Sequence, residues 1–397
     1  MNKFTLALSM TSALCAIPAF AATTKPLPPI PTLFTTLAAP ADPDHFTFVV
    51  SGDNRSTGHG YPMPPALNQI CLEIGSVRPA FTLWTGDAIE GYGDTPAEAN
   101  AEYDTFFASA ALTQSPMFMA PGNHEFSLDS ALLPIYQKRM GALYGSFDYG
   151  DSHFIALNTT PVLPDGKISA GGEIDAEQRA WLEADLKANA SAKNTFIFLH
   201  HYVYGPPDTG STIDTGFKST EDRDSLHKLF VQNHVRAVFC GHNHIYWHAA
   251  HDGVDYYISG GAGAPLDASP EQGGYLHYVV FHVDGDKVTS EILQPWHLLT
   301  TYPQGDAKGL TTETAFVENT NNTEVPARGI VFHIAPPAAG ASVTVSAKVS
   351  YKKGKIVPAQ IVSTHPSADG KSLEVVVAAT LPADRTTEVT ISSISNR

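Results

Sequence analysis

Short apolar runs alternate with longer amphipathic stretches over most of this chain. Between about residues 45 and 300, runs of strand length are followed by segments whose apolar positions recur at helical spacing. The segments with helical spacing and capping-type starts are 64–77, 96–112, 175–190 and 219–234. Strands that alternate with helices in this way lie in a sheet whose faces the helices cover, so the pattern predicts an α/β domain.

Other segments predict β-structure without helices. Residues 146–160 and 275–293 are typical of hairpins, the second with its turn at Asp284-Gly285. After a polar stretch at 301–324, segments such as SVTVSAKVS and SLEVVVAATL alternate at period two and are separated by turn residues. We therefore expect a small all-β appendage after the α/β domain.

The first 21 residues have the features of a cleaved signal peptide. Lys3 lies near the start, a short apolar stretch follows, and Ala19 and Ala21 form an A-x-A cleavage pattern. The apolar stretch is too short for a comfortable membrane span, although an uncleaved anchor is the alternative. A cleaved signal predicts a secreted or periplasmic protein.

These patterns divide the chain into five expected parts. In order, they are a signal peptide (1–21), a Pro/Thr-rich linker (22–44), the α/β domain (45–300), a polar linker (301–327) and a small β domain (328–397).

The charge of the chain argues against some partners. With 40 acidic against 24 basic residues and no basic run, the formal charge is −16, so we expect neither nucleic-acid nor anionic-membrane binding. No apolar stretch after the leader is long enough to span a bilayer. After signal cleavage the chain keeps Cys71 and Cys240, which are too few for a disulfide framework. The oligomeric state is not indicated.

Five apolar runs end in polar residues of the kinds that bind metal ions. The endings are SGDNR (51–55), TGDAIE (85–90), APGNHE (120–125), LHH (199–201) and CGHNH (240–244). In open α/β sheets, ligands bind beyond the carboxyl ends of the strands, so we expect these endings to meet at one edge of one sheet.

Each ending taken alone has a simpler explanation. An aspartate after a strand is more often a helix cap, and a strand-end histidine is usually a surface residue. Two carboxylates, an amide and three imidazoles at one edge favour a metal centre instead. Oxygen and imidazole ligands without thiolate suit iron, zinc, manganese or cobalt rather than calcium, and Cys240 is expected to be a buried strand residue.

The ordered series GD, GD, GNHE, H and GHNH, over about residues 45–265, resembles the calcineurin-like metallophosphoesterase superfamily. The resemblance implies a two-layered β-sandwich flanked by α-helices, with two divalent or trivalent transition-metal ions at the sheet edge. It implies these ligands: Asp53 and His244 for one ion, Asn123, His200 and His242 for the other, and Asp87 bridging both. His124 resembles the family's acid, which protonates the leaving group.

The sequence departs from the usual family pattern at the first motif. Many members have a histidine ligand where this chain has Arg55. The purple acid phosphatase branch also lacks that histidine and supplies a tyrosine where this chain has Glu90, with Tyr92 two residues further on. Water, Glu90 and Tyr92 remain as candidates for the missing ligand of the first metal ion. Arg55 is expected to bind the substrate phosphate, with a salt bridge to a nearby carboxylate as the alternative.

The two adjacent histidines of the fourth ending have different expected roles. His200 directly ends its apolar run and is preferred as the ligand, whereas His201 is expected to contact substrate. The following loop, 202–217, is expected to shape the pocket.

The resemblance implies an enzyme that hydrolyses small phosphate esters with a water molecule activated by the two metal ions. We expect a phosphomonoesterase. A phosphodiesterase acting on nucleotides or phospholipid head groups is the alternative. An alternative of another class is a non-catalytic binding or scaffold protein on a hydrolase fold, which would be expected to lose metal ligands.

Overall fold

The computed structural model describes most of the chain after the N-terminal segment. The described residues are 37–127, 130–169, 171–206, 216–296, 298–301, 312–319, 321, 324–336, 342–349, 355–366, 372–383 and 385–394. The predicted signal peptide and most of the linker at 22–44 lie outside these ranges. In the described part, no helix is long and apolar enough to cross a membrane.

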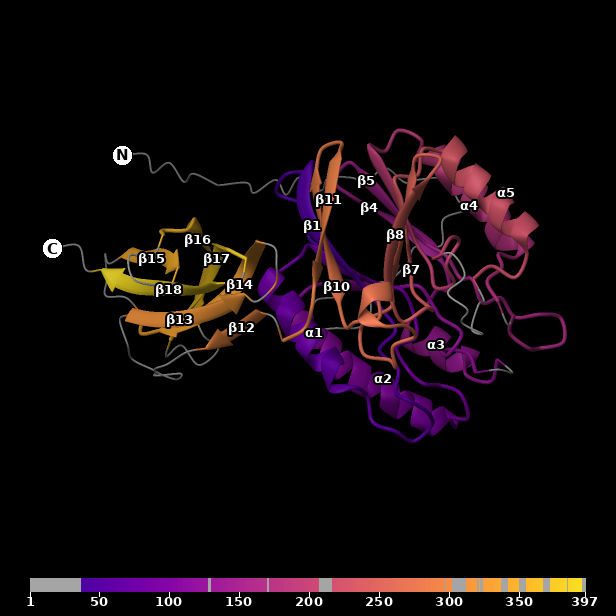
Figure 1. The fold of residues 1–397 in the computed structure, drawn as a ribbon, viewed down its shortest axis with the longest axis horizontal. Helices are drawn as coiled ribbons and strands as arrows, with labels where there is room; N and C mark the ends of the chain where they lie inside the picture. Colours follow the sequence, from indigo (N-terminus) through magenta and orange to yellow (C-terminus); the bar gives the residue numbers. More distant parts are fainter. Residues whose placement is uncertain are drawn as a thin grey trace, which may run out of the picture.

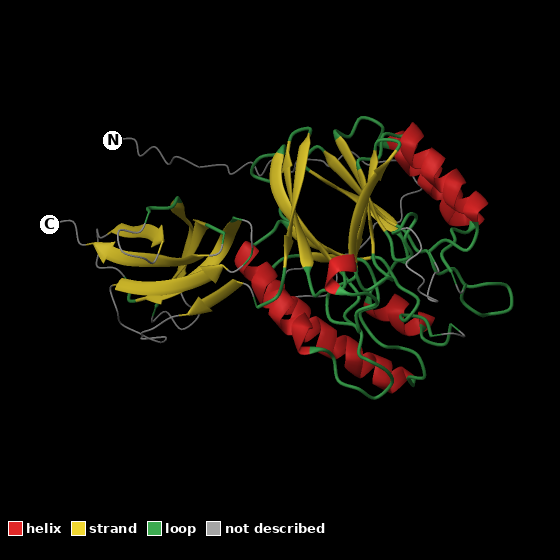
Figure 2. Ribbon diagram, viewed as in Figure 1, coloured by secondary structure: helices red, strands yellow, loops and turns green. Residues whose placement is uncertain are grey.

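Two twisted sheets pack face to face in the main domain (Figures 1 and 2). The first sheet has the order β11-β10-β1-β2-β3, and its strands are β1 (His45–Ser51), β2 (Phe81–Trp84), β3 (Met117–Met119), β10 (Tyr278–Asp284) and β11 (Lys287–Leu293). The second has the order β4-β5-β6-β7-β9-β8, and its strands are β4 (Gly145–Tyr149), β5 (Ser152–Ala156), β6 (Asn194–Phe198), β7 (Ala237–Cys240), β8 (Tyr246–His251) and β9 (Val254–Ser259). In the first sheet β1, β2 and β3 are parallel, while β10 and β11 on the other side of β1 are antiparallel. The second sheet is parallel from β5 to β9, with an antiparallel strand at each edge.

An aromatic core holds the two sheets together. Phe48 on β1 stacks on its sheet neighbours Phe81 and Phe281 and meets Phe154 and Phe196 of the second sheet edge-on or tilted, with ring centroids 5.1–5.6 Å apart. Aromatic pairs at such distances stabilise a core beyond the burial of their apolar area. The two-layered β-sandwich that the resemblance implied is therefore confirmed.

Helices cover the outer faces of the sandwich. The helices are α1 (Pro65–Val77), α2 (Pro96–Ala110), α3 (Leu133–Arg139), α4 (Ala176–Ala188) and α5 (Thr220–Gln232), with short 3₁₀ turns at Ala111–Thr113 and Pro270–Gln272. Apolar residues of α1 and α2 join one core with the first sheet, and those of α4 and α5 join another with the second. Thr95 and Glu98 form a reciprocal capping box at α2, while Asp175 and Ser219 cap α4 and α5. The four predicted helices are confirmed; α3 was not predicted, because seven residues are too few to show a period.

The hairpin β10–β11 differs from its prediction by one residue. Asp284 pairs with Lys287, so the turn consists of Gly285 and Asp286. Gly285 has φ +60°, a conformation that glycine adopts without strain. The other predicted hairpin, β4–β5, is present.

The C-terminal region is all-β, as expected (Figure 1). One sheet has the order β12-β13-β18-β15, from β12 (Leu298–Thr301), β13 (Thr312–Asn319), β18 (Arg385–Ile394) and β15 (Ser342–Val349). The other has the order β14-β17-β16, from β14 (Val325–Ile334), β17 (Leu373–Leu381) and β16 (Ala359–Pro366). Part of the expected linker at 301–327 is thus strand: the buried positions of β13 are Glu313, Ala315, Val317 and Asn319, and the two polar ones made the segment look like a linker.

Helix α1 joins the C-terminal strands to the main domain. Gly329 in β14 lies so close to α1 that a Cβ there would come 2.2 Å from the Gly75 carbonyl oxygen. The buried Glu73 carboxylate accepts hydrogen bonds from the Tyr278 hydroxyl (3.1 Å) and from the Trp296 backbone N–H (2.6 Å). These contacts fix the connection after β11 against α1.

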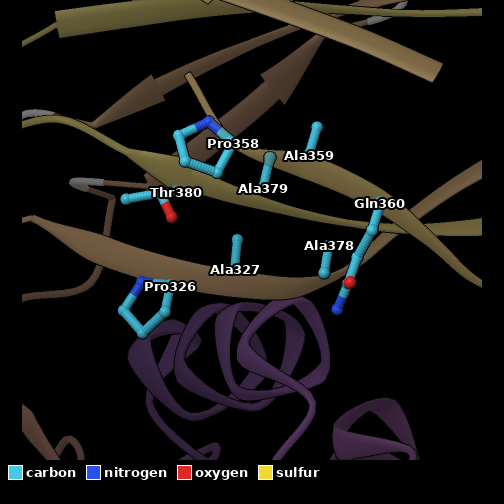
Figure 3. Close-up of a pocket in the computed structure, with 8 residues that line it drawn as sticks. All are labelled: Pro326, Ala327, Pro358, Ala359, Gln360, Ala378, Ala379 and Thr380. Carbon is cyan, nitrogen blue, oxygen red and sulfur yellow. The ribbon is translucent and has the colours of Figure 1, made fainter.

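A cavity of about 310 Å³ opens in the C-terminal region (Figure 3). Its walls come from β14, β16 and β17 and consist of Pro326, Ala327, Pro358, Ala359, Gln360, Ala378, Ala379 and Thr380. None of these residues is ionisable, so this cavity lacks the acids, bases and metal ligands of a hydrolytic site.

Candidate metal centre

The five polar strand endings meet, but on two sheets rather than one. β1, β2 and β3 belong to the first sheet, while β6 and β7 belong to the second. Backbone hydrogen bonds tie the loops together, including Asp53 N–H to Gly86 O (3.0 Å) and Gly241 N–H to His200 O (3.0 Å). The expectation of one edge of one sheet was wrong, because apolar runs do not reveal which sheet a strand joins.

The backbone is strained at three of the predicted ligands. Asp53, Asp87 and His242 have φ values of 62°, 53° and 71°, a left-handed conformation that is uncommon for residues other than glycine. Each such residue costs of order 1–3 kcal/mol and persists only where the surrounding structure enforces it, typically at functional sites. Next to Asp53, Gly241 admits the carboxylate, since a Cβ there would lie 2.2 Å from Asp53 Oδ2.

Four ligand-type atoms converge at the second predicted site. Asn123 Oδ1 lies 2.9 Å from His200 Nε2 and 3.1 Å from His242 Nδ1. The two imidazole nitrogens are themselves 3.1 Å apart, and His200 Nε2 is 3.3 Å from Asp87 Oδ1. His200 Nδ1 donates to the Thr85 carbonyl at 2.8 Å, which leaves the Nε2 lone pair directed toward the cluster. Two oxygens and two imidazole nitrogens this close together are a set that one cation can bind in place of shared protons.

Asp53, Asp87 and His244 form the other group. Each offers a ligand atom within 4.8 Å of the others. His244 Nδ1 donates to the Pro265 carbonyl (2.6 Å), so Nε2 is the free nitrogen, 3.7 Å from Asp53 Oδ1. Asp53 is fully buried, and its Oδ2 atom has no hydrogen-bond partner in the structure. A buried oxygen of this kind indicates a missing partner.

The electrostatics of both groups favour cations. Burial raises the pKa of Asp87 to about 7, against the opposing effect of Arg55. Burial and the nearby Asp87 carboxylate raise the pKa of Asp53 well above its usual range. Burial also lowers the pKa of His200 and of His244 to about 4, so both imidazoles are neutral and able to ligate. The orphaned oxygen and the convergent lone pairs fit two metal ions.

His124 lies beside this cluster and faces it with one nitrogen. Its Nδ1 contacts the backbone carbonyl of Glu90, and its Nε2 is 3.8 Å from Asp87 Oδ2. Burial, followed by the positive charge of Arg55, lowers the pKa of His124 well below its usual range. The ring therefore lies next to the Asp87 carboxylate, and neither of its nitrogens is among the four convergent atoms.

Arg55 and Glu90, which replace family ligands, form an ion pair. Arg55 Nη1 lies 2.9 Å from Glu90 Oε2, and its Nε lies 3.8 Å from Asp87 Oδ2. The Arg55 side chain is 20% exposed, so it can be reached from solvent. The structure therefore contains the salt bridge that was the alternative interpretation, in a position that also borders the predicted metal centre. Tyr92, the other candidate ligand, directs its hydroxyl to Asn123 Nδ2 at 2.6 Å.

His201 lies deeper than the sequence suggested. It is 1% exposed, its Nδ1 lies 2.9 Å from Thr159 Oγ1, and its ring centroid is 4.4 Å from that of His242. Its Nε2 is buried without a hydrogen-bond partner. Much of the adjacent loop, 207–215, lies outside the described residues, so the expected pocket wall is not described there.

Glu125 is a component of the site that the sequence analysis overlooked. Its fully buried carboxylate accepts the backbone N–H groups of Asp87 (2.9 Å), Ala88 (2.7 Å) and Gly122 (2.6 Å). It thereby joins the loop after β2 to the loop after β3, each of which carries a predicted ligand. Its place at the end of GNHE was a usable signal, because a carboxylate after a buried strand needs donors.

A profile of the calcineurin-like phosphoesterase family matches residues 30–246. No curated protein sequence matches the chain.

Several solved structures are similar to part of this chain. A dimetal phosphatase from Danio rerio is 15% identical, covering 62% of this chain and 95% of its own (TM-score 0.49). Purple acid phosphatase PPD1 from yellow lupin seeds is 16% identical, and the match covers 65% of this chain and 53% of the lupin chain (TM-score 0.49). GAP50, the anchor in the inner membrane complex of Plasmodium, is 11% identical, and the match covers 63% of this chain and 84% of the GAP50 chain (TM-score 0.47). Likenesses of this size do not assign a function.

Proposed function

The chain belongs to the calcineurin-like phosphoesterase family and is a metal-dependent phosphoester hydrolase; from this premise we propose that it is a phosphomonoesterase that acts outside the cytoplasm. Two transition-metal ions, drawn from iron, zinc, manganese and cobalt, are its proposed cofactors. The observation that carries the proposal is the convergence of Asn123, His200 and His242 beside Asp87, next to the orphaned Asp53 oxygen.

The proposed ligand assignment follows the two groups of side chains. Asp53 and His244 would hold one ion, Asn123, His200 and His242 the other, and Asp87 both. When bound, such ions lower the pKa of water and stabilise charge on a phosphoryl group. The protein contributes the fixed positions: the His200 and His244 rings are held by backbone carbonyls at their Nδ1 atoms, so their Nε2 atoms stay directed inward.

Two further residues are proposed to act on the substrate. Arg55 would bind phosphate oxygens through its guanidinium, whose donor fork matches phosphate geometry. Because Glu90 already pairs with Arg55, phosphate binding would have to compete with that ion pair or share the guanidinium with it. His124 would supply the proton for the leaving-group oxygen from Nε2. Because its Nδ1–H faces the Glu90 carbonyl, it would donate as the doubly protonated ring, a form that a negatively charged phosphate ester favours and that burial and Arg55 disfavour. His201, although buried, remains a proposed contact near His242.

A monoester has a terminal phosphate with more negative charge than a diester, and Arg55 beside the metal centre favours the more charged group. The test compares kcat/KM for an aryl phosphate monoester with that for the corresponding bis-aryl diester, both with the metal-loaded protein. We expect the monoester to be preferred. A preference for the diester would instead support the phosphodiesterase alternative.

Ligand variants separate an enzyme from a scaffold on the same fold. His200→Ala and Asn123→Ala should each reduce both bound metal and hydrolysis. The matched control is His248→Ala, which removes a half-exposed histidine that pairs with Asp255 on a surface hairpin. If metal content falls while no phosphate ester is hydrolysed by the unaltered protein, the scaffold alternative is favoured.

A further inference from the structure

The loop that follows Asp87 packs tightly on the loop that carries Asn123 and His124. Gly91 and Gly93 have φ values of +64° and +82°, which glycine adopts readily. A Cβ at Gly91 would come 1.8 Å from the His124 carbonyl oxygen, so only glycine allows this approach. The two glycines place Tyr92, which lies between them, directly against Asn123 and His124.

The Tyr92 hydroxyl determines which way the Asn123 amide points. Asn123 Nδ2 donates to this hydroxyl at 2.6 Å, while Oδ1 lies on the opposite side, toward His200 and His242. A side-chain amide has one acceptor oxygen and one donor nitrogen, so a rotated amide would present N–H groups to the cluster and would not ligate a metal ion. The Tyr92 hydroxyl can accept or donate, so it supports the inward oxygen by accepting from Nδ2 when a cation binds Oδ1.

The ring of the same tyrosine covers His124. The two rings are stacked, with centroids 3.9 Å apart and an interplanar angle of 25°. On the imidazole edge, Nδ1 contacts the Glu90 carbonyl, so the ring plane and its rotation are both restrained. Stacking on Tyr92 thus keeps Nε2 directed toward Asp87, 3.8 Å away.

We propose that Tyr92 is a positioning residue: its hydroxyl orients the Asn123 amide for metal binding, and its ring orients His124. The proposal rests on the proposed function, in which Asn123 is a metal ligand and His124 is the acid. In this role Tyr92 does not bind a metal ion itself; it acts on Asn123 by hydrogen bonding and on His124 by stacking.

The first test measures metal binding rather than activity. Metal-free protein is titrated with Mn²⁺ in a calorimeter, for the unaltered chain, Tyr92→Phe, Asn123→Ala and the control Tyr61→Phe, which removes the hydroxyl of a 63% exposed tyrosine. Loss of a hydrogen bond to a ligand typically weakens metal binding about 10–100-fold. We expect that loss in Tyr92→Phe, in the same binding step that Asn123→Ala weakens, and no change in Tyr61→Phe.

The amide mechanism is tested in a second background. Asn123→Asp supplies oxygens at both positions, so no amide has to be oriented. Tyr92→Phe should therefore weaken Mn²⁺ binding several-fold less in the Asn123→Asp background than in the original chain. An equal loss in both backgrounds would contradict the amide mechanism.

The ring is tested by its effect on proton donation. Tyr92→Leu removes the stacking surface, and should lower kcat more for alkyl phosphates than for aryl phosphates with good leaving groups. Tyr92→Phe keeps the ring and, with saturating Mn²⁺, should keep the wild-type ratio of these two rates. If Tyr92→Leu does not fold, a changed ratio in Tyr92→Phe at saturating metal still overturns this half of the proposal.

The results that would overturn the role of Tyr92 differ from those that would overturn the proposed function. Wild-type metal binding by Tyr92→Phe, together with weakened binding by Asn123→Ala, overturns the role of Tyr92 alone. Unchanged binding by Asn123→Ala overturns the ligand assignment on which both proposals rest. A tyrosinate ultraviolet difference signal that appears on Mn²⁺ addition and is lost in Tyr92→Phe would make Tyr92 a ligand, which contradicts the positioning role.

Discussion

The clearest structural prediction concerns Glu125, whose carboxylate joins two ligand loops. Glu125→Gln keeps the size of the side chain but replaces one oxygen with a donor group. Three backbone N–H groups, from Asp87, Ala88 and Gly122, point at the two oxygens, so at least one of them would face another N–H. Because the side chain is fully buried, water cannot replace the lost hydrogen-bond acceptor.

The cost follows from these three hydrogen bonds. Leaving one buried N–H without an acceptor costs about 1–3 kcal/mol, and each remaining bond loses about 1 kcal/mol when the acceptor is no longer charged. Burial and the Asp87 carboxylate raise the pKa of Glu125 to about 8, so most of the charge advantage is already lost near neutral pH. We therefore expect Glu125→Gln to lower the free energy of unfolding by about 1–3 kcal/mol.

Urea unfolding in the presence of chelator measures this loss, and hydrogen exchange localises it. The amides of residues 87, 88 and 122 should exchange faster in Glu125→Gln, while those of α5 should not. Glu183→Gln is the control, because Glu183 is half-exposed and pairs with Arg179 on the surface of α4, and surface pairs contribute about 0–1 kcal/mol. Unchanged unfolding and unchanged exchange at these three amides would refute the claim that Glu125 joins the loops.

Other variants test separate parts of the site and the fold. Arg55→Ala should keep its bound metal, lower kcat/KM by roughly 30-fold or more and weaken phosphate inhibition; wild-type values for both would make Arg55 a structural residue. His124→Ala should lower turnover by about 10²–10⁴-fold with metal content unchanged, and less for activated esters; an equal loss for all esters would remove its acid role. Burial lowers the pKa of His153, but the hydrogen bonds that its ring donates to Asp148 and Asp185 outweigh it and raise the pKa to about 9. Because the folded pKa exceeds the unfolded value of about 6.5, this ion pair stabilises the fold fully below pH ~6.5 and loses that effect as the pH rises through about 9, by up to about 3 kcal/mol. The difference in unfolding free energy between the unaltered chain and His153→Asn should therefore shrink over that interval, and a constant difference would contradict it. The mature protein should begin at Ala22 outside the cytoplasm, and N-terminal sequencing that finds Met1 on the stable product would contradict this.

The sequence predicted most of the fold because its local signals agree with the tertiary structure. Thr95 and Glu98 specify the start of α2 without help from the rest of the chain. The apolar runs identified the central strands, since these are buried on both faces. The same runs did not show that β6 and β7 belong to a second sheet, because strand pairing depends on contacts far apart in sequence.

The site was predictable to a similar extent. The residue types at the strand ends indicated metal chemistry, and the structure brings Asn123, His200 and His242 within hydrogen-bonding distance of one another. The contacts that fix those residues were harder to predict. The place of Glu125 at the end of GNHE was a usable signal, but the backbone N–H groups that it binds leave no pattern of spacing. Tyr92 acts through contacts across two loops, which leave no such pattern either.

The central claim is that two metal ions are needed for hydrolysis, and one titration tests it most directly. Metal-free protein is supplied with Mn²⁺ in steps, and bound metal and aryl phosphate hydrolysis are measured on the same samples. We predict binding that saturates near two ions per chain, with activity that rises as the second ion binds and is absent before metal is added. Full hydrolysis by the metal-free protein, or full activity once a single ion is bound, would contradict the account.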